Sequence, residues 1–92
     1  MITQIKCMVE DVHPVIINNS KQKQQTVIVE TIDDHKIKKL TLFGNKVSSF
    51  LATTEKGMFL FDYEIRNVLT ESGRYISYFN VVDFARLDDQ LN

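Results

Sequence analysis

Residues 38–51 (KKLTLFGNKVSSFL) constrain the fold of this 92-residue chain more than any other segment. The segment predicts a strand that ends on the aromatic Phe43, then a corner at Gly44 and a helix that begins at Asn45, a residue type favoured at helix starts. The apolar residues of the helix are spaced i, i+3 and i+4 and form one stripe: Val47, Phe50 and Leu51. A single short helix with one apolar side suits a plug for the end of a β-barrel.

The rest of the chain alternates apolar and polar residues with a period of two, which indicates β-strands. Five ranges are predicted as strands: Ile2–Val12, Gln25–Ile32, Ile37–Phe43, Met58–Val68 and Arg74–Leu87. Polar connections separate three pairs of strands: residues 18–24, 33–35 and 70–73. The helix is predicted to end by Thr53-Thr54, and residues 88–92 are predicted to form a frayed tail.

The order of elements is therefore β-β-β-α-β-β, in a single domain that spans residues 1–92. A short helix between the third and fourth of five strands is typical of the all-β, five-stranded Greek-key barrel known as the OB fold. A small sandwich of the same strands is the alternative, but it offers the helix no good place. The core is predicted to contain Phe59, Phe61 and Tyr63, together with Cys7, which alternates with apolar neighbours.

Charge and composition narrow the range of partners. The net charge of −1 argues against a general polyanion binder. Residues 1–50 hold seven lysines and five acidic residues, whereas residues 51–92 hold four basic and seven acidic ones. An asymmetry of this kind can mark a ligand surface on one side, and a difference this small also arises by chance. The chain has one cysteine, no apolar run near the roughly 20 residues that span a bilayer, and no signal-peptide pattern at its N-terminus. These features predict a reduced, cytoplasmic protein.

No residue pattern in the sequence supports catalysis. His13 and His35 stand far apart, without Cys, Asp or Glu at metal-ligand spacing, and Asp33-Asp34 reads as a turn. The three glycines are isolated, so the sequence has no phosphate-cradling glycine loop. We therefore expect neither an enzyme nor a metal or other cofactor.

Two short patterns resemble those of known OB-fold proteins. Leu40-Thr41-Leu42-Phe43-Gly44 resembles the leucine-threonine-leucine-aromatic-glycine corner of the OB domains of replication protein A, in which tryptophan is the commoner aromatic. Residues 23–31, with the same corner, are similar to those of a group of small bacterial OB-like proteins, and both resemblances run nearly end to end. Both imply an OB fold. The resemblance to replication protein A also implies a single-stranded DNA ligand, a base stacked on Phe43, and a second stacking aromatic early in the last strand, where this chain has Tyr75.

Strand alternation predicts, without any resemblance, which side chains near this corner face the core and which face outward. Leu40 and Leu42 share one face of the third strand, and Lys39, Thr41 and Phe43 share the other. With the leucines in the core, a lysine and an aromatic are predicted to face the ligand groove, which in an OB fold runs over strands two and three. Five cations are expected beside this groove: Lys21, Lys23, Lys39, Lys46 and Arg74.

The expected function is binding of single-stranded DNA, with RNA as the less favoured ligand, and with little sequence preference. Phe43 and Tyr75 would stack bases while the cations track the backbone. The alternative is a protein-interaction or assembly module, which the near-neutral charge suits better, with Leu60 and either Val82 or Phe84 forming a homodimer contact. An aromatic at a strand end also commonly packs at a core rim, so the exposure of the two aromatics distinguishes these interpretations.

Overall fold

The computed structural model describes residues 1–51 and 57–87. The elements are, in chain order, β1 (Thr3–Val12), β2 (Ile16–Ile17), β3 (Lys23–Thr31), β4 (Ile37–Phe43), α1 (Asn45–Leu51), β5 (Met58–Leu69) and β6 (Tyr75–Arg86). The five predicted strands and the helix that begins at Asn45 are confirmed, and the two-residue strand β2 is an addition to them. The predicted helix end at Thr53-Thr54 and the frayed tail at residues 88–92 lie outside the described residues.

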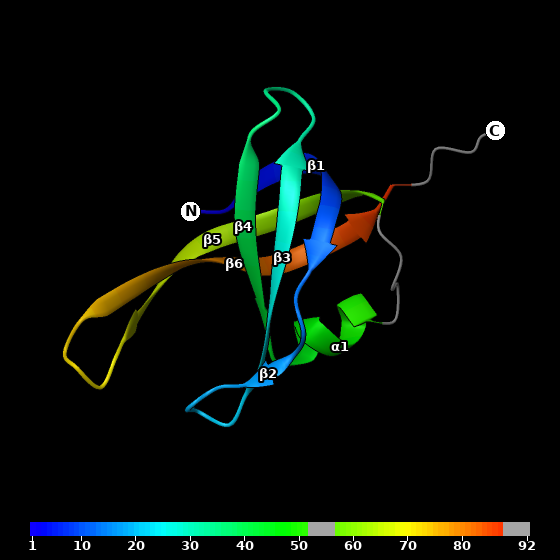
Figure 1. Cartoon of the computed structure of the whole chain (residues 1–92). Coiled ribbons are helices and arrows are strands. Elements are labelled where there is room, and N and C mark those ends of the chain that lie inside the picture. Colours follow the sequence, from blue (N-terminus) through cyan, green and yellow to red (C-terminus); the bar gives the residue numbers. More distant parts are fainter. Residues whose placement is uncertain (52–56, 88–92) are drawn as a thin grey trace.

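The five long strands close into a barrel (Figure 1). β3 pairs antiparallel with both β1 and β4, β4 pairs parallel with β6, and β5 pairs antiparallel with both β6 and β1. The circuit β1-β3-β4-β6-β5-β1 is therefore complete. The predicted all-β, five-stranded barrel with one helix is confirmed, and the strand order is compatible with an OB-like fold.

The barrel core follows the predicted alternation. Its largest fully buried side chains are Phe59, Phe61, Leu40 and Leu42, and Tyr63 and Cys7 are buried as predicted. The helix plugs one end, because Val47 and Phe50 are buried among the strands. The Phe50 ring lies 5.4 Å from that of Phe59 and 5.5 Å from that of Phe84. Phe84, predicted as a candidate dimer contact, therefore packs against the core, and Leu60 and Val82 are half-buried.

Gly44 makes the corner between β4 and α1 possible. Its φ of 60° lies in the left-handed region, which glycine adopts without steric cost. In this conformation its N–H donates to the carbonyl of Lys23 (2.8 Å), and its own carbonyl accepts from the N–H of Val47 (3.1 Å). A Cβ atom at this position would stand 3.0 Å from Nε2 of Gln22. The corner therefore requires glycine both for its backbone conformation and for the close approach of Gln22.

β5 and β6 continue beyond the barrel as a two-stranded arm, here defined as residues 64–79. β1 pairs with β5 only as far as Tyr63, and β4 pairs with β6 at Asn80, whereas β5 and β6 stay paired up to Leu69 and Tyr75. The register of this pair shifts where Asp62 and Tyr63 face Asp83 and Val81, so Val82 is an extra residue in a β-bulge. The arm gives the molecule its long dimension, 50 Å against 27 and 21 Å (Figure 1).

Candidate functional site

A groove crosses the outer face of β3 and β4, between the loop at residues 18–22 and the arm. It consists of two hollows of about 540 and 510 Å³. The first, which we call the loop-side hollow, is lined by Asn18, Asn19, Ser20, Gln22, Gln24, Phe43, Arg66, Val68, Leu69, Thr70, Glu71, Ser72, Ile76 and Tyr78. The second, the strand-side hollow, is lined by Gln24, Thr26, Lys39, Thr41, Ile76, Ser77, Tyr78 and Phe79. The hollows share Gln24, Ile76 and Tyr78, so they adjoin, and each falls in the size range of ligand sites.

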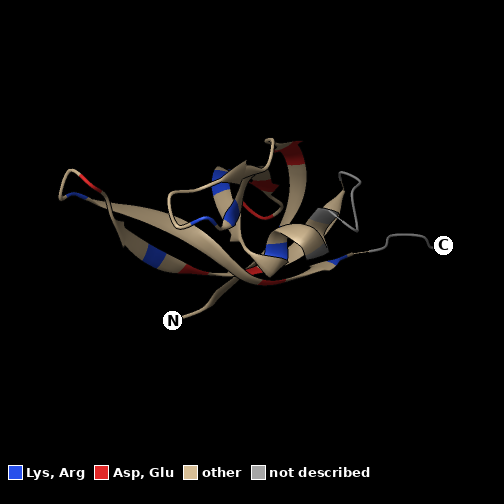
Figure 2. Ribbon diagram, turned by 90° about the horizontal axis from the view of Figure 1, so that it is seen from below, with Lys and Arg blue, Asp and Glu red and all other residues tan. Residues whose placement is uncertain are grey.

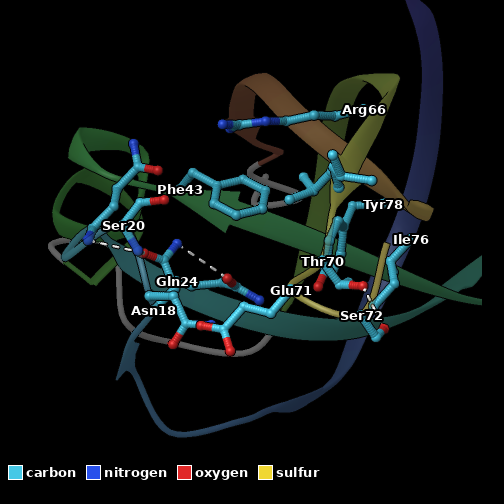
Figure 3. Close-up of a pocket in the computed structure, with 14 residues that line it drawn as sticks. Asn18, Ser20, Gln24, Phe43, Arg66, Thr70, Glu71, Ser72, Ile76 and Tyr78 are labelled. Carbon is cyan, nitrogen blue, oxygen red and sulfur yellow. Dashed lines mark hydrogen bonds between the residues drawn. The ribbon is translucent and has the colours of Figure 1, made fainter. Parts of the chain in front are cut away.

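Phe43 forms part of the floor of the loop-side hollow, and two side chains from the arm cover its ring (Figure 3). Tyr78 meets it edge-on, with ring centroids 5.7 Å apart and planes at 87°. The Arg66 guanidinium lies 4.5 Å from the ring centroid, which is a cation–π contact. Arg66 and Tyr78 are direct partners in the β5–β6 register and so share one face of the arm. Because of these contacts Phe43 is only 8% exposed.

Asn18 organises the loop that forms the opposite wall. Its backbone N–H donates to the carbonyl of Gln22 (3.0 Å), and its carbonyl accepts from the N–H of Lys21 (2.9 Å). Its side-chain Oδ1 accepts from the backbone N–H groups of Ser20 and Gln22, both at 3.0 Å. Its Nδ2 donates to Oε1 of Gln24 at 3.3 Å. An asparagine that satisfies its own turn in this way fixes the loop, so the wall is formed before any ligand arrives.

The two predicted stacking aromatics lie on different surfaces. Phe43 is on the groove face of β4, as alternation predicted, but it is buried under Arg66 and Tyr78. Tyr75 is 70% exposed, yet it lines neither hollow. By strand alternation it points to the opposite face of the arm from Ile76 and Tyr78. The structure therefore does not bring Phe43 and Tyr75 together, and Tyr78 is the tyrosine in the groove.

The predicted cations surround the groove unevenly. Lys39 lines the strand-side hollow. Lys21, Lys23 and Arg74 are exposed and line neither hollow, although Lys21 stands in the loop wall between two lining residues. The Lys46 ammonium lies 3.9 Å from the carboxylate of Asp83 on β6. Basic and acidic residues are interspersed along the arm and the barrel and do not form one continuous basic stripe (Figure 2).

Sequence reasoning missed Arg66, Tyr78 and Gln24 as groove residues. In the sequence, alternation along residues 58–68 places Arg66 on the strand face opposite Phe59 and Phe61, and Tyr78 and Phe79 point to opposite faces with no signal for which one is inside. The missing signal was the bulge at Val82, which reverses the inward and outward positions along β6. Phe84 on one side of the bulge and Phe79 on the other are both packed against the core, although their positions differ by an odd number.

Metal-ligand and thiol chemistry is limited among the described residues. Within residues 1–51 and 57–87, no group of three or more His, Cys, Asp or Glu side chains is close enough to hold a metal ion. Burial raises the pKa of the Cys7 thiol to about 12, so it is not an activated nucleophile. In the same part of the chain, no helix has the length and apolar character needed to cross a membrane.

Comparison of the sequence with models of known protein families and with the sequences of curated proteins finds no match. The barrel and the groove between the loop and the arm are therefore the features that bear on function. These define a small closed β-barrel with a preformed surface groove, compatible with an OB-like fold.

Proposed function

We propose that the protein binds single-stranded nucleic acid, most favourably DNA, in the groove between the loop and the arm. The observation that carries this proposal is the position of Tyr78, which lines both hollows, with the cation of Arg66 in one hollow and that of Lys39 in the other. A groove over these two strands, flanked by the same two connections, is where OB folds bind oligonucleotides. An aromatic bordered by cations is the arrangement that single-stranded nucleic acid requires.

Each groove residue has a distinct part in this proposal. Tyr78 stacks on a base, an interaction worth about 1–3 kcal/mol. Phe43 supports the Tyr78 ring from below through their edge-on contact. Arg66 and Lys39 contact phosphates beside the stacked base, while Lys21 and Arg74 at the rim add longer-range attraction. With two to four phosphate contacts, the slope of log affinity against log salt is expected to be about −1.4 to −2.8.

A fluorescence anisotropy titration tests this function. The probe is a labelled single-stranded DNA of about 15 nucleotides and mixed sequence, at about 20 mM and about 200 mM NaCl. The expected result is saturable binding at low salt that weakens by about 1.4 to 2.8 orders of magnitude at the higher salt. A flat titration at low salt, with a folded protein by circular dichroism, would rule the function out.

Variants on the two faces of the arm locate the binding site. Tyr78→Ala is expected to lower the affinity at least fivefold, because it removes the stacking ring. Tyr75→Ala is the matched control, since it removes the same side chain from the opposite face of the same arm. Lys39→Gln is a second groove variant, and as an exposed substitution it should weaken binding without affecting the fold. Loss of affinity in Tyr75→Ala alone would instead support stacking by Tyr75 outside the groove.

A second candidate function is protein interaction through the far face of the arm. Ile65, Leu69 and Tyr75 share this face and are 63%, 57% and 70% exposed. Exposed apolar side chains gathered on one surface are typical of protein contacts. Sedimentation velocity over a range of protein concentrations tests whether this face joins two copies. A self-association that Leu69→Ser abolishes would favour this candidate, and a concentration-independent monomer would count against it.

A further inference from the structure

The charges lining the loop-side hollow are balanced. Among the described residues that line it, Arg66 alone is basic and Glu71 alone is acidic, and the Arg66 guanidinium is already stacked on Phe43. The lining lysine of the groove, Lys39, belongs to the strand-side hollow. Beside Arg66 the hollow can take a phosphate, but the rest of its described lining holds no cation to bind one. This remaining part suits the neutral part of a nucleotide, which is the base.

Two glutamine side chains present unused hydrogen-bonding groups to this hollow. Nε2 of Gln24 donates no hydrogen bond within the described part of the chain, while its Oε1 accepts one from Asn18 (3.3 Å). That bond orients the Gln24 amide. The side-chain amide of Gln22 makes no hydrogen bond to any described residue, and its backbone is held on both sides by Asn18. The Gln24 amide is therefore positioned, and its Nε2 and the second lone pair of its Oε1 are left for a ligand, while the Gln22 amide lines the same hollow.

The position of Gln24 relative to Tyr78 indicates which part of a nucleotide the Gln24 amide would contact. Both residues line both hollows, so a base stacked on Tyr78 would lie in the groove that Gln24 borders. A carboxamide offers a donor and an acceptor side by side. This pattern matches the N7 and N6 edge of adenine, whereas a phosphate offers acceptors only.

We propose that the groove reads the edge of an adenine base through Gln24, with Gln22 beside it, so that the protein prefers adenine-rich over thymine-rich single strands. This inference rests on the proposed function and differs from the expectation of little sequence preference. Bidentate pairing of an amide with adenine discriminates against other bases by about 1–3 kcal/mol, which corresponds to a fivefold to 150-fold change in affinity, roughly.

The test compares deoxyadenosine and deoxythymidine homopolymers of about 12 nucleotides in anisotropy titrations at low salt. The wild-type protein is expected to bind the adenine strand about tenfold more tightly. Gln24→Leu keeps the size of the side chain and removes its polar atoms, so it should reduce the preference to about twofold or less while thymine-strand binding stays nearly unchanged. The matched control is Gln4→Leu. Gln4 is an exposed glutamine on β1, outside the groove, whose side chain donates to Asp62 on β5, so this variant should keep the preference.

The outcomes separate this inference from the proposed function. If both strands bind with the same affinity, or thymine binds better, the adenine preference is wrong while nucleic-acid binding stands. If the preference persists in Gln24→Leu, it comes from stacking on Tyr78 and the glutamine readout is wrong. If neither strand binds, the proposed function fails as well.

Discussion

The guanidinium of Arg66 on β5 lies 4.5 Å from the centre of the Phe43 ring on β4, although β4 and β5 are not neighbours in the barrel. This cation–π contact and the edge-on contact between Tyr78 and Phe43 join the arm to the barrel surface. A two-stranded ribbon is marginally stable by itself, so these contacts help to hold the arm over β3 and β4. The groove therefore depends on the pairing of Phe43 with Arg66 as much as on the barrel.

Arg66→Ala is expected to loosen the arm. Loss of the cation–π contact should lower the free energy of unfolding by about 0.5–1 kcal/mol. The amides of the arm should also exchange their hydrogens faster, while those of the barrel core keep their protection. Urea denaturation and hydrogen exchange followed by NMR measure the two effects. Arg74→Ala, in the exposed turn of the arm, is the control and should change neither.

Phe43→Ala and Tyr75→Ala should differ sharply in stability. Phe43 is 8% exposed and packs against two arm residues, so its truncation is expected to cost about 3 kcal/mol. Tyr75 is 70% exposed, and its truncation should change the free energy of unfolding by about 0.5 kcal/mol or less. Urea denaturation measures both. A nearly neutral Phe43→Ala would mean that the ring is free and that the described packing is wrong.

Much of the barrel could be predicted because alternation is a local property. The inward residues of β3, β4 and the first half of β5 follow from their spacing, and the aromatic-glycine corner marks the end of β4. The burial of Phe43 could not be predicted in the same way. It depends on Arg66 and Tyr78, which come from other strands and reach Phe43 only because the arm lies over β4.

The face on which Tyr75 lies depends on a single extra residue. Counting by twos from Phe84, which packs against the core, would place Tyr78 inward and Tyr75 outward along an unbroken strand. The bulge at Val82 reverses this assignment, because one more residue fits into β6 than β5 can pair. No glycine or proline marks the bulge in the sequence. The groove tyrosine could therefore be identified only from the strand register.

Gly44→Ala and Gly73→Ala separate backbone strain from crowding. Both glycines have positive φ, 60° and 82°. A Cβ at Gly44 would also approach Nε2 of Gln22 to 3.0 Å, whereas nothing lies within 4 Å of a Cβ at Gly73. We expect Gly73→Ala to cost about 1 kcal/mol from strain alone and Gly44→Ala distinctly more. Thermal denaturation compares them, and equal losses would show that Gln22 moves aside freely.

The buried thiol of Cys7 should make the protein less stable in alkali. Burial raises its folded-state pKa from 9.0 to about 12. Above pH 9 the unfolded chain releases this proton while the folded chain retains it, so the unfolded state gains the advantage. The contribution of Cys7 to stability is therefore complete below pH 9 and decreases as the pH rises toward 12. Urea denaturation across this interval, with Cys7→Ala as the reference, measures the difference.

The same burial predicts slow chemistry at the Cys7 thiol. In the folded protein at pH 8, a thiol reagent such as a chromogenic disulfide should react only as fast as the protein opens, because the thiolate is scarce and inaccessible. In concentrated urea, where the chain is unfolded, Cys7 should react with the reagent as fast as an ordinary exposed thiol. Fast labelling of the folded protein would contradict the burial of Cys7.

The most direct test of the central claim is a two-dimensional 15N–1H NMR titration with single-stranded DNA. The account predicts shifts of amide signals in the loop at residues 18–24, in β4 at residues 39–43, and in the arm around Arg66 and Tyr78. Signals from the barrel interior should stay in place. The absence of any shift at low salt, or shifts confined to the far face of the arm around Ile65 and Tyr75, would contradict nucleic-acid binding in the groove.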